Sequence, residues 1–166
     1  MSIRYAENVH IIPIYAPQAT TAADLETAHV NIENAQWITF LCGWGALTTD
    51  SGDGVIKVYS TTAATTVNAA SQSFQYRLSS AVADDNWGAI TSVDSTATAG
   101  APIGDTNENM FMVIDVDPSA VEAADAGAKY IHLLMDGSAL ATNPSFSAVA
   151  FIESRYPQNE HISTTA

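Results

Sequence analysis

Large apolar side chains alternate with polar ones along much of the chain, which is the pattern of half-buried β-strands. In residues 74–78, Phe, Tyr and Leu alternate with Gln and Arg. Residues 36–43 and 109–116 are almost continuously apolar, which predicts strands covered on both faces. Further strands are predicted at 55–59, 130–135 and 147–152, with weaker candidates at 28–32 and 89–93. Residues 9–15 are extended, but Pro13 restricts them to an edge strand or an arm.

Turn and helix signals separate these runs. Residues 50–54 are rich in Asp and Gly and predict a hairpin loop between two strands. One short helix is predicted at about 117–126, with Asp117 as N-cap, Pro118 as first helical residue and Gly127 as C-cap. A weaker pattern favours a helical turn or two at 19–26, and the small polar residues of 61–73 predict a loop or flap.

This succession of short strands predicts a mainly β protein, an antiparallel β-sandwich or a jelly-roll or barrel-like domain with one short helix. Three segments are expected: an extended N-terminal arm at 1–17, the β domain at 18–158 and an exposed tail at 159–166. The arm is rich in apolar residues, and its prolines limit helix formation. It is suited to pairing with the sheet edge of a neighbouring subunit, although it equally fits the first strand of its own domain.

The composition of the chain excludes some classes of function. The 166 residues include 18 acids and 5 bases, a formal net charge of -13, while 47% of the residues are hydrophobic. Such a chain can build a core, but it has no basic stripe for a nucleic-acid backbone and would be repelled by anionic membranes. It shows neither an apolar run of bilayer length nor a signal-peptide core, so we expect a soluble protein made in a cytoplasm.

No catalytic constellation is apparent. The four histidines are far apart and form neither an HxH nor an HExxH motif. His132 lies within a strand on the same face as Tyr130 and Leu134, which favours a hydrogen-bonded core histidine over a metal ligand. Cys42 lies in an apolar run and is expected to be a buried free thiol. We therefore predict that the protein is not an enzyme and has no catalytic residues, no cofactor and no metal site.

The carboxylates leave two alternatives open. Asp50 and Asp53 lie in a glycine-rich loop that fits either a solvated turn or a Ca²⁺ site, although no Glu completes an EF-hand. Asp115 and Asp117 share a face if extended; Asp117 serves as the helix cap, and Asp115 faces solvent or pairs with Lys129 or Arg155.

The tryptophans and arginines are the candidates for contacts with other subunits. Trp37 and Trp44 bracket the strand at 36–43 and are expected in the core. Trp87 follows a polar turn, so an interface position is an alternative to the core. In so acidic a chain, Arg77 and Arg155 are candidates for ion pairs within or between subunits, or are lone surface residues.

Four groups of segments together resemble a known family. They are residues 34–40 (NAQWITF), 74–80 (FQYRLSS) with 87–89, 112–120 (MVIDVDPSA), and 148–153 (AVAFIE) with 155–158. This succession, spanning about residues 35–158, resembles small structural proteins of tailed bacteriophages, namely head decoration or cement proteins. The resemblance rests on short strand and turn segments and includes no catalytic motif.

The resemblance implies a virion structural protein on the capsid exterior that binds the major capsid protein and stabilises the shell, as a homo-oligomer expected to be a trimer. No direct contact with nucleic acid or membrane is expected. The alternative is a tail or head-fibre component, or a glycan-binding adhesin of the virion. The candidate interface residues are Tyr5, Ile11, Ile12, Tyr15, Arg77, Trp87 and Arg155.

Overall fold

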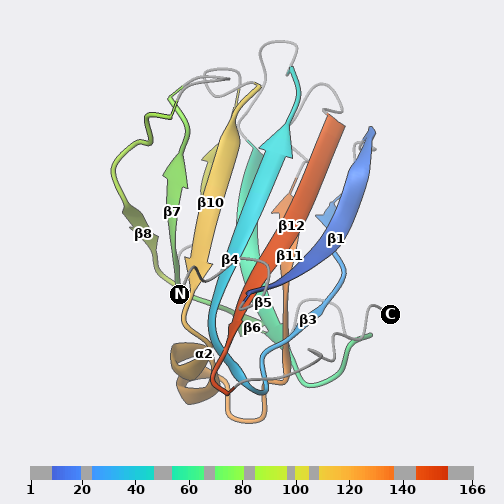
Figure 1. Cartoon of the computed structure of the whole chain (residues 1–166), viewed down its shortest axis with the longest axis vertical. Helices are drawn as coiled ribbons and strands as arrows, with labels where there is room; N and C mark the ends of the chain where they lie inside the picture. Colours follow the sequence, from blue (N-terminus) through green and yellow to red (C-terminus); the bar gives the residue numbers. More distant parts are fainter. Residues whose placement is uncertain are drawn as a thin grey trace, which may run out of the picture.

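The computed structural model describes residues 9–19, 24–46, 54–65, 70–80, 85–96, 100–104, 109–136 and 145–156. Within these ranges the chain is mainly β, with two antiparallel sheets and one short helix, as the sequence predicts. Figure 1 shows one sheet in front of the other, with the helix α2 (Pro118–Ala124) at the lower end of the pair. The architecture is a β-sandwich.

Sheet A contains six strands in the order β1-β12-β4-β10-β7-β8. Their bounds are β1 (Val9–Ala19), β12 (Ser145–Ser154), β4 (Ala35–Trp44), β10 (Phe111–Val116), β7 (Phe74–Leu78) and β8 (Thr91–Val93). The predicted strands at 36–43, 74–78, 109–116 and 147–152 are therefore confirmed, and they lie side by side in one sheet. The segments on which the predicted resemblance rests thus form neighbouring strands.

Sheet B is built around β11 (Tyr130–Asp136) and β5 (Gly54–Thr61), and β11 pairs with β5 along its whole length. The short strands β2 (Leu25–Glu26) and β3 (Val30–Asn31) pair with β11, while β6 (Ala70–Ser71) and β9 (Ala101–Ile103) pair with β5. The backbone N–H of Ala28, between β2 and β3, donates to the carbonyl of Ile14 in β1 at 2.9 Å. This segment therefore joins the edges of the two sheets.

The core lies between the sheets, where alternate residues of each strand point inward. In sheet A, Phe40, Ile114 and Ala150 are fully buried, and in sheet B so are Val58 and Leu133. Cys42 and Trp44 belong to the same core, as expected. Burial raises the pKa of the Cys42 thiol far above its usual value, so the group is neutral and inert in the folded protein.

Helix α2 begins where the sequence predicts and ends earlier. The Asp117 side chain accepts a hydrogen bond from the Ser119 backbone N–H at 2.9 Å, and Pro118 follows as the first helical residue. This bonding lowers the pKa of Asp117, with the Ser119 hydroxyl as the largest cause. The C-cap is Asp125 rather than Gly127, but Gly127 has a φ of +100° and allows the chain to turn toward β11.

Two predictions about connections are wrong, and a third holds only in part. The residues at 50–54 do not close a hairpin, because β4 and β5 belong to different sheets. Leu25 and Glu26 form a strand rather than a helical turn, and the predicted flap at 61–73 contains β6. Asp50 and Asp53 lie outside the described residues, as do Tyr5 and the tail at 159–166.

The N-terminal arm is also corrected where it is described. From Val9 onward this segment pairs with β12, with Ile11 opposite Phe151 and Pro13 opposite Val149. It is an edge strand of the chain's own sheet, the second of the two alternatives, because its inward residues complete the core at Ile14. Residues 1–8 of the predicted arm lie outside the described ranges.

Candidate functional sites: an apolar sheet face and a buried histidine cluster

The first candidate site is the outer face of sheet A, the face turned away from sheet B. The strand registers place its side chains in rows that cross the sheet. One row contains Ile11, Phe151, Thr39, Asp115 and Gln75, and the next contains Pro13, Val149, Leu41, Val113 and Arg77. All ten are half-buried or exposed. The face is therefore accessible across five strands.

This outer face is largely apolar. Its aliphatic centre is Leu41, Val113 and Val149, and further apolar side chains lie around it: Ile11 is 48% exposed, Phe111 43% and Trp37 37%. The prediction that Trp37 is a core residue is wrong, and β4 and β10 are covered on one face rather than two. An apolar sheet face of this extent is typical of an interaction surface.

Charged groups on the outer face are few, and Asp115 among them is already hydrogen-bonded. The Asp115 carboxylate accepts hydrogen bonds from the Thr39 hydroxyl at 2.7 Å and the Trp37 indole N–H at 3.4 Å. The predicted pairing of Asp115 with Lys129 or Arg155 is not found; these bases pair with Glu33 and Glu122 instead. Asp115 therefore fixes the exposed indole on the sheet surface.

Two of the predicted interface residues lie together at one end of this face. The Arg77 guanidinium carbon lies 6.0 Å from the centre of the Trp87 ring, within cation–π range, and Trp87 is 38% exposed. A β-bridge between Ser79 and Trp87 holds the indole beside β7. Arg77 and Trp87 thus form a joint aromatic and cationic contact at the margin of the apolar face.

The other predicted interface residues differ in where their side chains lie. Ile11 lies on the outer face, whereas Ile12 and Tyr15 are half-buried and pack against the core, Tyr15 with its ring centre 5.7 Å from that of Phe146. Arg155 donates from Nε to the Ala35 carbonyl at 2.9 Å and pairs with Glu122 at 3.6 Å, so it joins parts of one subunit. Ile12, Tyr15 and Arg155 are thus engaged within the subunit.

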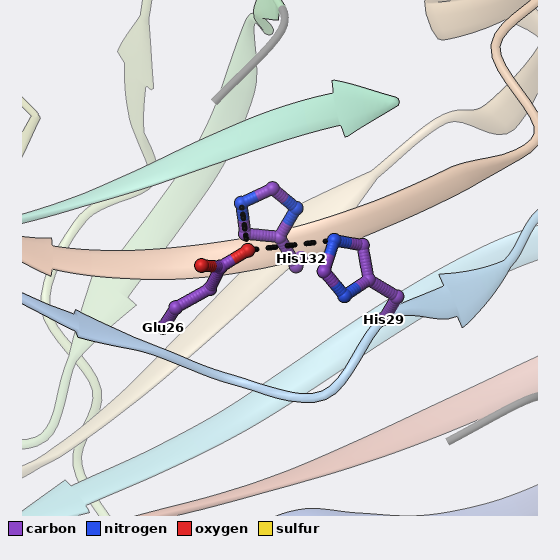
Figure 2. A group of neighbouring side chains, drawn as sticks. All are labelled: Glu26, His29 and His132. Carbon is purple, nitrogen blue, oxygen red and sulfur yellow. Dashed lines mark ion pairs between the residues drawn. The ribbon is translucent and has the colours of Figure 1, made fainter. Parts of the chain in front are cut away.

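The second candidate site is a cluster of Glu26, His29 and His132 on sheet B, the HHE cluster (Figure 2). Each residue offers one ligand atom, and these atoms lie within 4.8 Å of one another. Glu26 Oε1 is 3.3 Å from His132 Nε2 and 3.4 Å from His29 Nε2. The two imidazole rings lie 4.4 Å apart, centre to centre.

Strand registers place these three residues together. His132 lies in the centre of β11, and Glu26 in β2 pairs with the next-but-one residue, Leu134. Ile131, Leu133 and Met135 point into the core between the sheets, so His132 points to the opposite face of sheet B, as predicted from its spacing with Tyr130 and Leu134. There it is covered on one side by His29 and stacked on Tyr59, 5.9 Å away.

Burial controls the protonation of His132. His132 is completely buried and His29 is 7% exposed, while the Glu26 side chain remains 25% exposed. Burial, and then the neighbouring His29, lower the pKa of His132 to about 4, so its imidazole is neutral at neutral pH. A neutral imidazole keeps a lone pair on one of its two ring nitrogens, and the Glu26 carboxylate supplies a second electron donor close to the ring.

The prediction of a hydrogen-bonded His132 is wrong. Within the described part of the chain, neither of its ring nitrogens nor Glu26 Oε1 has a hydrogen-bond partner, although all three atoms are buried. The sequence does not predict the cluster, because His132 lies far along the chain from Glu26 and His29. The one local signal is the Glu26-x-x-His29 spacing, which is uninformative until β11 brings His132 beside it.

Comparisons of the chain with protein-family models, with curated proteins and with solved structures find no match. The helix in the described ranges has neither the length nor the apolar character needed to cross a membrane. The fold and composition define an acidic β-sandwich protein with an accessible apolar sheet face. The resemblance to phage decoration proteins stays a prediction.

Proposed function

We propose that this protein is a structural component of a bacteriophage virion, a decoration protein that binds the outer surface of the capsid and stabilises the shell. The observation that carries the proposal is the apolar outer face of sheet A. It presents Leu41, Val113 and Val149 across neighbouring strands, with Trp37 and Phe111 at its borders. Together with the resemblance of four groups of segments to phage decoration proteins, this surface favours a binding role.

Charge favours the same surface. The chain carries a net charge of -13, yet the described acids on the outer face of sheet A are Asp115 and Glu153, and Asp115 is already hydrogen-bonded. A contact through this face buries apolar area, worth about 25 cal/mol per Å², while few carboxylates lose solvent. Partners on this surface are the major capsid protein and further copies of the chain, for which a trimer is the expected assembly.

Binding to capsids tests the proposal. The purified chain would be mixed with shells of the major capsid protein from the same genome, and the bound fraction measured by cosedimentation and located by cryo-electron microscopy. Val113→Glu, on the outer face of sheet A, is expected to weaken binding at least tenfold, about 1.4 kcal/mol. Val55→Glu, which adds the same charge at a half-buried strand position of sheet B, is the matched control.

Two results would contradict the proposal. Shells that do not bind the wild-type chain at any concentration would exclude a decoration role. Equal loss of binding in Val113→Glu and Val55→Glu, with both variants folded by circular dichroism, would show that the outer face of sheet A is not the contact. Light scattering of the free chain would show in the same samples whether it forms trimers.

A glycan-binding role in a tail or head fibre is the second candidate. Exposed indoles beside polar groups are typical of sugar-stacking surfaces, and Trp37 lies beside Asp115 while Trp87 lies beside Arg77. A glycan array would test this role directly. Binding that is lost in both Trp37→Ala and Trp87→Ala, with no binding to shells, would favour the adhesin over the decoration protein.

A further inference from the structure

The HHE cluster lies on the sheet opposite the proposed capsid-binding face and has no part in that function. Its composition is that of a transition-metal site: two imidazoles and one carboxylate are a ligand set used for Zn²⁺ and for other divalent ions that favour nitrogen. We propose that Glu26, His29 and His132 bind a divalent transition-metal ion, Zn²⁺ in the first instance, which holds the β2–β3 segment on β11.

Distances within the cluster support the proposal. In tetrahedral zinc sites with bonds of about 2.0 to 2.1 Å, neighbouring ligand atoms are about 3.3 to 3.4 Å apart. Glu26 Oε1 lies 3.3 Å from Nε2 of His132 and 3.4 Å from Nε2 of His29. Three ligand atoms within 4.8 Å of one another need only small side-chain rotations to surround a single ion.

The burial of the ligands fits a cation as well. Glu26 Oε1 and both ring nitrogens of His132 are buried without a hydrogen-bond partner in the described chain. A buried carboxylate oxygen between two imidazoles is costly alone, and a divalent cation would satisfy it together with the ring nitrogens that face it.

The described lysines do not supply that positive charge. Lys57, which pairs with Leu134 across the strands, has its ammonium 3.5 Å from Asp136. Lys129 is likewise paired, at 3.5 Å, with Glu33. Glu26 is 25% exposed, so an ion can reach the cluster from its side without passing through the core.

The position of the cluster indicates a structural role. β2 and β3 are two-residue strands at the edge of sheet B, and the chain between them also bonds to β1 of sheet A. Two ligands come from this short segment and the third from the long strand β11. Metal binding would therefore fasten an otherwise weakly paired edge that closes one side of the sandwich, because an ion that binds only the folded chain stabilises the fold.

Calorimetric titration of the full-length, chelator-treated chain with ZnCl₂ tests the site. We expect one Zn²⁺ per chain, with CaCl₂ giving no heat at the cluster because Ca²⁺ prefers oxygen ligands. Titration with Co²⁺ should give the visible absorption of a four-coordinate ion with nitrogen ligands. Glu26→Gln and His132→Gln should each weaken zinc binding by at least about 100-fold, more than the loss of an outer ligand contact.

The control variant is His10→Gln, which removes an imidazole from β1 and leaves the HHE cluster unchanged. It should bind Zn²⁺ like the wild type. Amide hydrogen exchange supplies a second readout: zinc should slow exchange in residues 24–32 of the wild type and not in Glu26→Gln. Because Glu26 is partly exposed and Gln has nearly its shape, this variant remains informative if His132→Gln fails to fold.

Three results would overturn the proposal. The first is a wild-type chain that binds no Zn²⁺. The second is a folded Glu26→Gln variant that binds it with unchanged affinity, which would place the ion elsewhere. The third is zinc binding that leaves hydrogen exchange in residues 24–32 unchanged. None of these results bears on capsid binding, so the two proposals are tested independently.

Discussion

Replacing His132 by leucine should have opposite effects on stability with and without zinc. In the metal-free protein the two buried ring nitrogens lack hydrogen-bond partners in the described chain. A buried polar group without a partner costs about 1 to 3 kcal/mol, whereas an apolar side chain of similar volume does not pay this cost. The change of shape, between the rings of His29 and Tyr59, costs up to about 1.5 kcal/mol.

Taking the lower half of these ranges, His132→Leu should raise the free energy of unfolding by about 1 kcal/mol in a chelating buffer. For a chain of this length that corresponds to a rise of about 2 to 4 °C in Tm. Zinc at 100 times its Kd should stabilise the wild type by about 2.7 kcal/mol and leave the variant unchanged. The wild type should then be the more stable protein by about 1 to 2 kcal/mol.

Thermal and urea unfolding, each with chelator and with zinc, would measure both differences. His10→Leu is the control and should respond to zinc as the wild type does. A variant that is clearly less stable than the wild type in chelator would refute the reasoning, since it would show that the His132 nitrogens are well bonded in the metal-free fold. A variant that remains the more stable one in zinc would refute the stabilising role of the ion.

Three further substitutions or reagents probe the fold. Gly100→Ala should lower the free energy of unfolding by about 1 to 3 kcal/mol in urea, because the new Cβ would lie 2.9 Å from the Ile56 carbonyl carbon. Gly45→Ala is the control and should be nearly neutral, because its Cβ would meet nothing closer than 3.7 Å. Equal effects of the two substitutions would contradict this account. Asp117→Ala should cost about 1 kcal/mol at pH 7. Because folding lowers the Asp117 pKa, that cost should be present above about pH 4 and shrink as the pH falls below it, so a constant difference at pH 7 and pH 3 would exclude the cap. Cys42 should react with a thiol reagent only in denaturant, and rapid labelling of the native protein would show that the strand β4 opens.

Local patterns were sufficient to predict most strands and the helix. Alternation placed β7 correctly because polar and apolar residues face different surroundings there, and Asp117 with Pro118 marks a helix start by backbone chemistry alone. The strand at 36–43 shows the limit of the same reasoning. The strand is apolar on both faces, so its sequence does not distinguish the buried face from the accessible one. For this reason the sequence predicts Trp37 in the core, although its side chain is 37% exposed.

Long-range pairing could not be predicted. The turn residues at 50–54 indicate that the chain changes direction, but whether β5 pairs with β4 or joins a second sheet depends on strands much later in the sequence. The HHE cluster depends on the same information, since His132 meets Glu26 only through the register between β11 and β2. Sites assembled in this way leave no fixed spacing in the sequence, which explains why the histidines looked unrelated.

The acidity of the chain makes the apolar outer face of sheet A its most favourable contact surface. Two copies of a chain with a net charge of -13 repel each other, and so do such a chain and any acidic surface. A contact is least costly where few charges come close together. The outer face of sheet A meets that condition: the Arg77 guanidinium lies near the Trp87 ring, and Asp115 is hydrogen-bonded to Thr39 and Trp37. The net charge therefore disfavours contacts between acidic surfaces, and the apolar centre at Leu41, Val113 and Val149 supplies the attraction for a contact through this face.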